Sequence, residues 1–454
     1  MLKDTVFQFL AAILVAFVVA AILAESYRVL FAMLAGLTLV AGLAYFLPRY
    51  WRSADEKKIA DLRKGFTNSD RDWRGYVPWR TDVLTALYGT NNVFQLFGKR
   101  YCVVCVPMLR RYDWTRGKEF NDACELDATF KRFLPARSAR KLVDEYAEVE
   151  SVNVRYGNRV GFYLHQIELN EGRVSRIVLR ATTFWDNVRS CQSLSYELWK
   201  AYRAHRDTAR RSPQMYLPMR MALTQVTDAK PILDAASVPD DSYLPILGIE
   251  ALLVLRHDRT EPWRFATWKR SNRVVDKQGY YQFPPAGIYE LFCNDENHEP
   301  YNLIREFSVT SALLREFAEE LFDRTAFEDN RNLTSAEIRE YAKNRDLLNM
   351  LNGEPPRASW TLLGVVFNLE PMRCDLAFAI VVDQMPRNWH FRAGRREAAP
   401  NQFDLFSFKE IASRLGDDDA EPLCPASAGM LKLAAPYLQE RGVLSDLDLQ
   451  TMFA

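Results

Sequence analysis

The sequence predicts an α-helical transmembrane hairpin followed by α+β cytoplasmic domains. Three observations predict this class: two long uncharged apolar runs, basic residues directly after the second run, and alternating strand-like and helix-like segments in the rest of the chain. The runs are Thr5–Ala24 and Val29–Leu47. At 1.5 Å per residue, each is long enough to cross a hydrocarbon core of about 30 Å.

The loop between the two runs has only four residues, Glu25 to Arg28, so two such helices would be antiparallel. Lysines and arginines are concentrated after Pro48, and the positive-inside rule then places both termini in the cytoplasm. We therefore expect a multi-pass membrane protein; the resemblance described below implies the inner membrane of a bacterium. The alternative is a cleaved signal peptide, but Ile22-Leu23-Ala24 is a poor cleavage site and the second run follows at once.

The amino-acid composition argues against several classes of function and of site. The 59 basic and 58 acidic residues give a net charge of +1, which does not favour a binder of nucleic-acid polymers. The seven cysteines are an odd number and are scattered, so a disulfide framework is not expected. Cys102 and Cys105 form a lone CxxC inside an apolar run, where a buried strand is a better interpretation than a zinc or redox site.

We predict four regions. Residues 1–50 form the hairpin, 51–80 a juxtamembrane helix and linker, 81–239 an α+β middle domain, and 240–454 a second folded domain. In the middle domain, Tyr101–Val106, Val160–Ile167 and Val174–Ala181 are strand-like, and Cys191–His205 is helix-like. The last boundary follows the polar loop from Asp234 to Ser242.

The most specific local pattern is Arg315-Glu316-Phe317-Ala318-Glu319-Glu320-Leu321, in a helix that Ser308 or Thr310 could cap. Its glutamates stand at positions i, i+3 and i+4, so one helix face presents three carboxylates. Their mutual repulsion would be relieved by a divalent cation, and oxygen ligands suit Mg²⁺ or Mn²⁺. A solvated acidic helix face is the alternative interpretation.

This run resembles the Nudix box, G-x5-E-x7-R-E-U-x-E-E-x-G-U, in which U is bulky and apolar. The neighbouring segments also have the Nudix order: strands at Ile249–Arg256 and Phe265–Arg270, a Pro-Gly turn at Phe283–Gly287, strands at Thr361–Asn368 and Leu376–Val382, and a helix at Ala426–Arg441. The resemblance implies a C-terminal α/β/α sandwich. It also implies that Glu316, Glu319 and Glu320 hold the metal, with Arg315 as their ion-pair partner.

The chain departs from the Nudix pattern at four positions. Tyr301, Phe307, Phe322 and Asp323 stand where the box has its first glycine, early glutamate, late glycine and last apolar residue. Aromatic residues resist backbone angles that glycine allows. We therefore expect weak or absent pyrophosphohydrolase activity, while nucleotide binding remains compatible with the retained carboxylates.

As a whole, the chain resembles the transmembrane SMODS-associated Nudix effectors of cyclic-oligonucleotide-based antiphage signalling in bacteria (CBASS). The resemblance implies a homo-oligomeric receptor that binds a cyclic nucleotide and disrupts the lipid bilayer. A membrane-tethered Nudix pyrophosphohydrolase acting on a nucleotide is the alternative, and an inactive scaffold is a third. Candidate phosphate-binding side chains are Arg155, Arg159, Arg176, Arg180, Lys269 and Arg270.

Overall fold

The computed structural model divides into two compact units, Met1–Lys64 and Gly65–Ala454. It describes residues 56–69, 72, 74–114, 120–150, 159–223, 242–270, 279–291, 306–322, 333–391, 402–416 and 422–453. Within the first unit, residues 56–64 are helical. The second unit contains every element discussed below.

The prediction of a transmembrane hairpin is corrected by the structure. No helix in the described part of the chain is both long enough and apolar enough to cross a membrane. The longest helix among the described residues is α5 (Phe184–Arg211), with 28 residues. It carries charges along its length, and charged side chains are costly in a bilayer core. The runs Thr5–Ala24 and Val29–Leu47 lie outside the described residues, and the inner-membrane localisation inferred from them is corrected with them.

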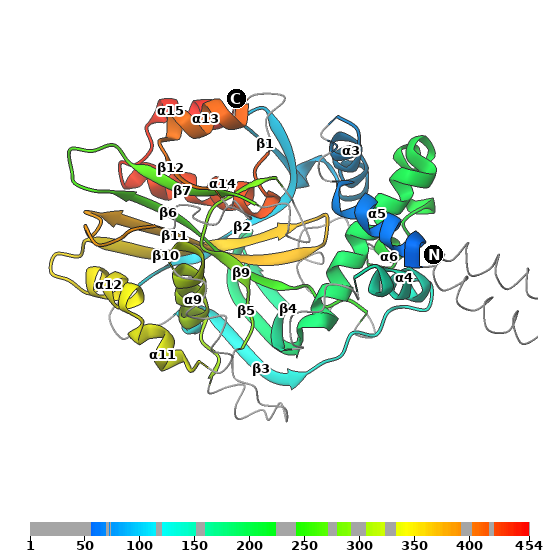
Figure 1. Ribbon diagram of the computed structural model, residues 1–454, viewed down its shortest axis with the longest axis horizontal. Helices are drawn as coiled ribbons and strands as arrows, with labels where there is room; N and C mark the ends of the chain where they lie inside the picture. The colour runs from blue at the N-terminus through cyan, green and yellow to red at the C-terminus, as the bar shows by residue number, and fades with distance from the viewer. Residues whose placement is uncertain are drawn as a thin grey trace, which may run out of the picture. The chain divides into compact units, whose positions relative to one another are not determined.

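The described fold is instead a mixed α/β structure around one sheet of twelve described strands, ordered β12-β7-β6-β11-β10-β2-β5-β3 along its main path (Figure 1). Off this path, β1 pairs with β2, β4 with β5, β8 with β7 and β9 with β6. The strands are β1 (Val93–Leu96), β2 (Lys99–Asp113), β3 (Cys124–Phe130), β4 (Val160–Asn170), β5 (Arg173–Thr183), β6 (Leu247–Arg256), β7 (Arg264–Lys269), β8 (Tyr281–Gln282), β9 (Ala286–Ile288), β10 (Ala358–Asn368), β11 (Arg373–Asp383) and β12 (Gln402–Phe406).

The sheet continues across the predicted boundary near residue 240. Strand β2 of the middle region pairs antiparallel with β10, for example Val104 with Phe367. On the other side of β10, β11 pairs antiparallel with it and parallel with β6. The middle and C-terminal regions therefore share one hydrogen-bonded sheet.

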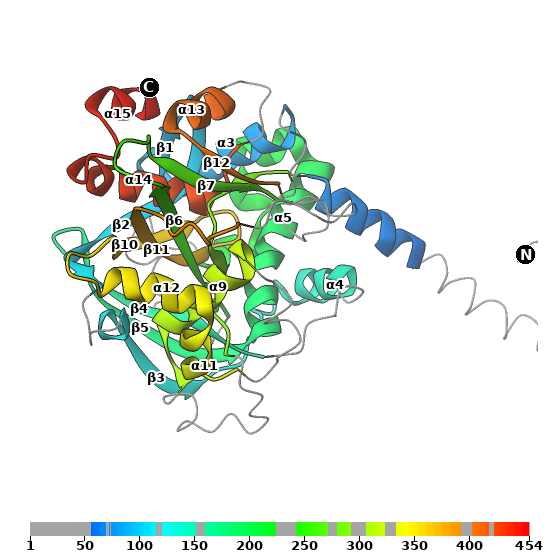
Figure 2. The same ribbon diagram turned by 60° about the vertical axis from the view of Figure 1, so that its left-hand side comes forward.

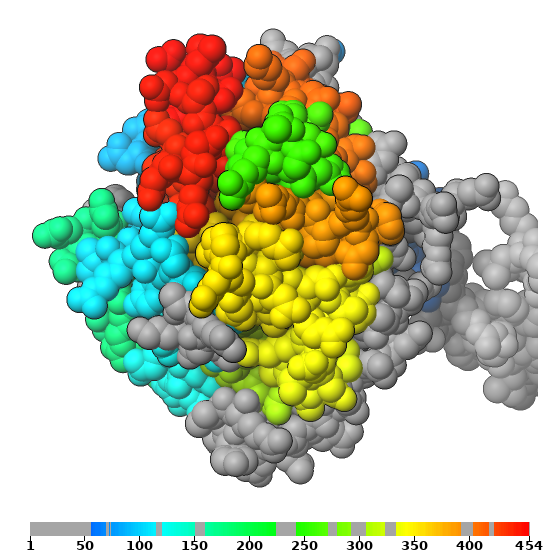
Figure 3. Space-filling model, turned by 90° about the vertical axis from the view of Figure 1, so that its left-hand side faces the viewer, coloured from blue at the N-terminus to red at the C-terminus, as the bar shows by residue number. Residues whose placement is uncertain are grey.

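Helices cover both faces of the central strands (Figures 1 and 2). Helix α14 contacts β2, β6, β10 and β11 on one face, whereas α9 contacts β6 and β9 on the other. Figure 3 shows α11 and α12 in yellow on the side turned toward the viewer, with the C-terminal helices in red. Besides α5, the helices are α3 (Tyr76–Tyr88), α4 (Arg140–Glu150), α6 (Pro218–Leu223), α9 (Val309–Leu321), α11 (Ser335–Glu340), α12 (Ala342–Leu351), α13 (Phe408–Gly416), α14 (Pro425–Glu440) and α15 (Asp446–Phe453).

Side-chain alternation along the strands builds the core on the α14 face. Leu252 and Val254 of β6 and Ala377 and Ala379 of β11 are all buried there against α14. The CxxC pair obeys the same alternation. Cys102 contacts Thr81 O of α3 and Cys105 contacts Gly429 O of α14, so the two thiols lie on opposite faces of β2. The predicted strand is confirmed by β2, in which Cys102 is buried and Cys105 is half-buried. Two thiols on opposite faces of a strand cannot bind the same metal ion.

Candidate functional site

Helix α9 carries the Nudix-like residues and begins where the sequence predicts. The Ser308 hydroxyl accepts a hydrogen bond from Ser311 N–H and caps the helix. Leu313, Leu314, Phe317 and Leu321 are fully buried and hold α9 against the sheet. The helix ends at Phe322, which leaves the three glutamates on its last two turns.

The Pro-Gly turn lies directly against this acidic face. Gly287 of β9 approaches Glu316 so closely that a Cβ atom at this position would overlap the carboxylate. Ala286 N–H donates a hydrogen bond of 2.7 Å to Glu320 Oε2. A side chain at position 287 would therefore displace the Glu316 carboxylate, and the strand contacts two of the three carboxylates of the helix.

Arg315 is the internal cation of the site. It is 3 % exposed and forms ion pairs with Glu316 and, at 3.6 Å, with Glu319 Oε1. Its guanidinium also donates to the backbone carbonyls of Ile288 and Glu290. The predicted role of Arg315 as an ion-pair partner agrees with these contacts, which join α9 to the segment after β9.

A fourth carboxylate was missed by the sequence analysis. Glu290 is an ion-pair partner of Arg159, with 3.5 Å between Oε2 and Nη1, and it also lies close to Arg315. The described residues at this site thus bring together four carboxyl groups (Glu290, Glu316, Glu319 and Glu320) and three guanidiniums (Arg159, Arg270 and Arg315). The sequence signal was weak, because Glu290 precedes the box in a segment without periodicity.

Burial disfavours the ionised form of the carboxyl groups at this site. Burial raises the pKa of Glu320 well above its usual value, and the neighbouring Glu316 raises it further. Burial also raises the pKa of Glu290. Both shifts favour the protonated acid over the carboxylate, so a bound cation would relieve an electrostatic penalty here.

The six residues predicted to bind phosphate lie in different parts of the structure. Arg159 and Arg270 lie at the acidic site, since Arg159 pairs with Glu290 and Arg270 is close enough to lower the pKa of Glu320. Arg270 also donates to the Gln282 side chain. Lys269 ends β7 beside it. Arg155 lies outside the described residues.

Arg176 and Arg180 lie elsewhere, on β5. Arg176 pairs with Glu125 at 2.6 Å and with Glu168 at 2.7 Å, and Arg180 pairs with Asp127 at 2.7 Å. These are cross-strand ion pairs on an accessible sheet face. The structure therefore does not bring these two arginines to the acidic helix.

Two further carboxyl groups are buried in the sheet, those of Glu250 and Asp375. Glu250 of β6 is 2 % exposed and bonds to the Ser427 hydroxyl of α14. Asp375 of β11 is 1 % exposed and pairs with Arg373 at 2.6 Å. Burial, and then the proximity of Asp375, raise the pKa of Glu250 to about 8. A carboxyl inside an apolar strand was the sequence signal for both residues.

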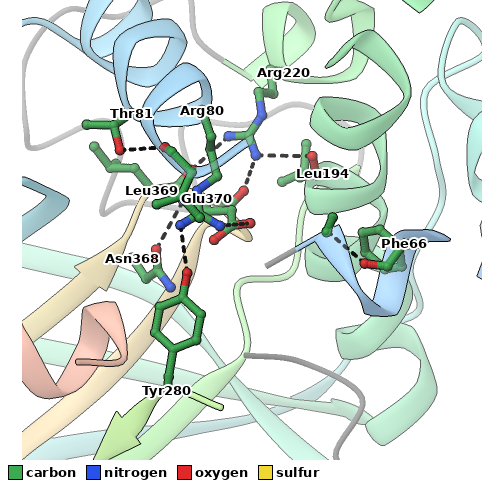
Figure 4. A network of polar contacts seen from close by, with 11 residues as sticks. Phe66, Arg80, Thr81, Leu194, Arg220, Tyr280, Asn368, Leu369 and Glu370 are labelled. Atoms are coloured by element: carbon green, nitrogen blue, oxygen red, sulfur yellow. Dashed lines mark hydrogen bonds and ion pairs between the residues drawn. The ribbon is translucent and has the colours of Figure 1, made fainter. Parts of the chain in front are cut away.

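A different polar cluster, the arginine network, is shown in Figure 4. Arg80 of α3 pairs with Glu370 at 2.8 Å and donates to the Tyr280 hydroxyl at 3.3 Å. Arg220 of α6 donates to the carbonyls of Leu194, Leu369 and Glu370. Glu197 of α5 accepts from the backbone N–H groups of Met219 and Arg220. This network ties the helices of the middle region to the β10–β11 turn.

The acidic residues of α9 offer oxygen ligands of the kind that Mg²⁺ and Mn²⁺ bind. Among the residues that the structure describes, however, no three acidic, histidine or cysteine side chains are arranged to hold a metal ion. Glu316 is held by Arg315 and Glu320 by the Ala286 amide. A cation would therefore require a rotation of Glu319 or Glu320 away from these partners.

The departures from the Nudix pattern have local explanations where they are described. Phe307 is buried and packs against Phe162 and Tyr289, with ring centroids 5.4 and 5.5 Å away. Phe322 ends α9 with backbone angles of −124° and −63°, which need no glycine. Tyr301 and Asp323 lie outside the described residues.

No protein-family model matches this chain, and no curated protein matches it either. The resemblance to Nudix proteins therefore rests on the residues named above and on nothing wider.

Proposed function

We propose that the acidic face of α9 binds the phosphates of a nucleotide through a divalent cation, and that the protein is a nucleotide receptor rather than an efficient hydrolase. The observation that carries this proposal is the group of four carboxyl groups at the site, which among the described residues lie close to three guanidiniums, those of Arg159, Arg270 and Arg315. Mg²⁺ or Mn²⁺ would offset negative charge in this group, and phosphate oxygens commonly complete the coordination of Mg²⁺.

The individual contacts assign separate tasks. Glu319 and Glu320, at the end of α9, would hold the cation, which neutralises charge and polarises a phosphate oxygen. Arg159 and Arg270 would contact the remaining phosphate charge, because guanidiniums donate to phosphate in a planar fork. Arg315 is buried and orients Glu316.

Binding is favoured over turnover by the way in which Glu316 is held. Its carboxylate is engaged by Arg315 and lies against Gly287, so it has little freedom to take a proton from an attacking water. A cyclic oligonucleotide is the ligand class that the CBASS resemblance implies, and ligand-dependent assembly into a homo-oligomer is the accompanying proposal.

The test is calorimetric titration of the full chain with inorganic pyrophosphate and with cyclic dinucleotides and trinucleotides, with and without Mg²⁺. We expect binding only with Mg²⁺, and a loss of at least about tenfold in affinity in Glu319→Gln. Glu261→Gln, in the exposed β6–β7 turn, is the matched control and should bind normally. Sedimentation of the same samples measures assembly.

Two results would contradict the receptor. Binding that is equally tight in Mg²⁺ and in a chelator would remove the cation from the proposal. Many turnovers of a nucleotide per chain, abolished by Glu319→Gln, would make the protein a hydrolase instead.

A further inference from the structure

Glu290 lies in the segment that follows β9, beside two arginines of the acidic site. Its Oε2 is 3.5 Å from Nη1 of Arg159, and it also lies close to Arg315. The side chains of Arg159 and Glu290 are 20 % and 15 % exposed. The ion pair is therefore in contact with solvent, and an anion from solution can reach the Arg159 guanidinium.

Backbone hydrogen bonds fix the two side chains near each other. Glu290 forms an antiparallel bridge with Gly161 of β4, and Leu291 N–H donates to the Val160 carbonyl oxygen at 2.9 Å. Arg159 directly precedes β4 and is two positions from Gly161, so it shares that face of the strand. The contact between Arg159 and Glu290 thus follows from the pairing of this segment with β4, and it would form again whenever a ligand leaves.

This ion pair is longer than the buried pair of the arginine network. Its nitrogen and oxygen are 3.5 Å apart, whereas those of Arg80 and Glu370 are 2.8 Å apart. Burial raises the pKa of Glu290, although Arg315 and Arg159 act in the opposite direction. The two guanidiniums therefore do not fully compensate the buried carboxylate. A long, partly solvated ion pair contributes little free energy and can be exchanged for another anion.

A phosphate group is a stronger partner for Arg159 than this carboxylate. A terminal phosphate carries more negative charge at neutral pH and offers three acceptor oxygens to the planar guanidinium. The Arg315 guanidinium donates to the Glu290 carbonyl oxygen at 3.3 Å, so a cation remains beside Glu290 when Arg159 turns to a phosphate. The exchange consequently leaves no isolated charge at the site.

We propose that Glu290 is an internal competitor of the ligand phosphate for Arg159. Its carboxylate holds the guanidinium in the ligand-free protein, and a nucleotide phosphate displaces it on binding. This inference rests on the proposed function and adds regulation to the same site. A ligand is bound only by the difference between its own interaction with Arg159 and the ion pair that it replaces, so anions of lower charge, such as carboxylates, are rejected.

The test is calorimetric titration of the full chain with inorganic pyrophosphate in saturating Mg²⁺, as a double-mutant cycle on Arg159 and Glu290. Glu290→Gln should bind pyrophosphate about fivefold more tightly than the natural protein, a factor that a partly exposed ion pair can supply. Arg159→Gln should bind it more weakly. The gain from Glu290→Gln should disappear when Arg159→Gln is also present, because no guanidinium is then left to compete for.

The cycle separates competition from the loss of a negative charge. Removal of a carboxylate near a phosphate also reduces repulsion, but that effect does not depend on Arg159 and would persist in the double variant. Glu290→Asp keeps the charge and shortens the side chain by one methylene group, so it should tighten binding in the same direction. It replaces Glu290→Gln in the cycle if the latter does not fold.

The matched control is Glu168→Gln. Glu168 of β4 pairs with Arg176 at 2.7 Å, and neither side chain belongs to the acidic site. We expect pyrophosphate binding to be unchanged in this variant. Thermal denaturation of all variants measures whether they are folded.

The outcomes distinguish the two proposals. If pyrophosphate binds with Mg²⁺ but the Glu290 variants bind it no more tightly, the competitor is overturned and the phosphate site stands. The same holds if the gain persists without Arg159, or if Arg159→Gln binds as tightly as the natural protein. If neither the natural protein nor the Glu290 variants bind pyrophosphate, the proposed function falls and the competitor falls with it.

Discussion

The arginine network and the acidic site of α9 are both buried polar clusters, but their charges are balanced differently. In the network, Arg80 and Arg220 face Glu197 and Glu370, and backbone carbonyls accept hydrogen bonds from the Arg220 guanidinium. Burial raises the pKa of Glu197 to about 7, so burial affects a carboxyl group in this cluster too. At α9, four carboxyl groups face three guanidiniums among the described residues. Desolvated charges are tolerated when they are paired and hydrogen-bonded, and an imbalance raises carboxyl pKa values.

This difference indicates which cluster serves stability and which one serves a ligand. The arginine network needs no ligand to balance its charges. Replacing one of its residues should therefore destabilise the fold without a specific effect on cation or nucleotide binding. An acid-rich cluster is left with a penalty that a cation can remove. The predictions below test this distinction, beginning with the largest expected effect.

Replacing Arg220 with Met should destabilise the protein by roughly 3–5 kcal/mol, because it leaves three backbone carbonyls and the Tyr88 hydroxyl without their buried donor and removes the charge beside Glu197. Chemical denaturation measures the change. Arg176→Met, on the accessible face of β5, is the control and should leave the denaturation midpoint unchanged. A stable Arg220→Met protein would show that the network is dispensable.

Glu250 should make stability depend on pH. Its pKa is raised to about 8 in the fold from an ordinary value of 4.5, so the folded chain holds a proton that the unfolded chain has lost. Stability should therefore be greatest below pH 4.5 as far as this group is concerned, and should fall as pH rises toward 8, by at most about 1.4 kcal/mol per pH unit.

Glu250→Gln keeps the shape of the protonated acid and should flatten this slope in denaturation curves between pH 5 and 8. Glu410→Gln, at an exposed helix start, should not flatten it. If Glu250→Gln leaves the slope unchanged, the Glu250 carboxyl is not the cause of this pH dependence of stability.

Gly287→Ala should destabilise the protein by about 1–3 kcal/mol, because the new methyl group overlaps the Glu316 carboxylate. It should also weaken Mg²⁺-dependent pyrophosphate binding by displacing α9 from β9. Gly416→Ala, where nothing lies within 4 Å of the added Cβ, is the matched control for both measurements. Equal stability of the two variants would contradict the close approach.

Glu320→Gln should have the smallest effect on stability, within about 1 kcal/mol and toward greater stability when Mg²⁺ is absent, because the amide has the shape of the protonated acid that burial favours at this position. The same variant should lose Mg²⁺-dependent binding. Thermal denaturation with and without Mg²⁺ measures both effects, with Glu440→Gln on the accessible end of α14 as control. Strong destabilisation without Mg²⁺ would show that the acidic site is structural.

Much of the secondary structure could be predicted from local sequence. The strands β2, β4, β5, β6 and β10 and the helices α5, α9 and α14 lie where periodicity and capping residues indicate them. Thr334 caps α11, and the helical stretch breaks at Tyr341 into α11 and α12. Uncharged runs were the least reliable local signal, because hydropathy alone predicted membrane spans that the described residues do not contain.

The sequence by itself determined that Glu316, Glu319 and Glu320 share one face of a capped helix, because the helical repeat and the cap depend on residues a few positions apart. Only the tertiary structure decided what this face meets. Gly287 and Ala286 reach it through the pairing of β9 with β6, Arg159 reaches Glu290 from 131 positions away, and Arg80 reaches Glu370 across 290 positions. Such contacts depend on strand pairing and on burial summed over the whole sheet, and no short segment of sequence encodes those energies.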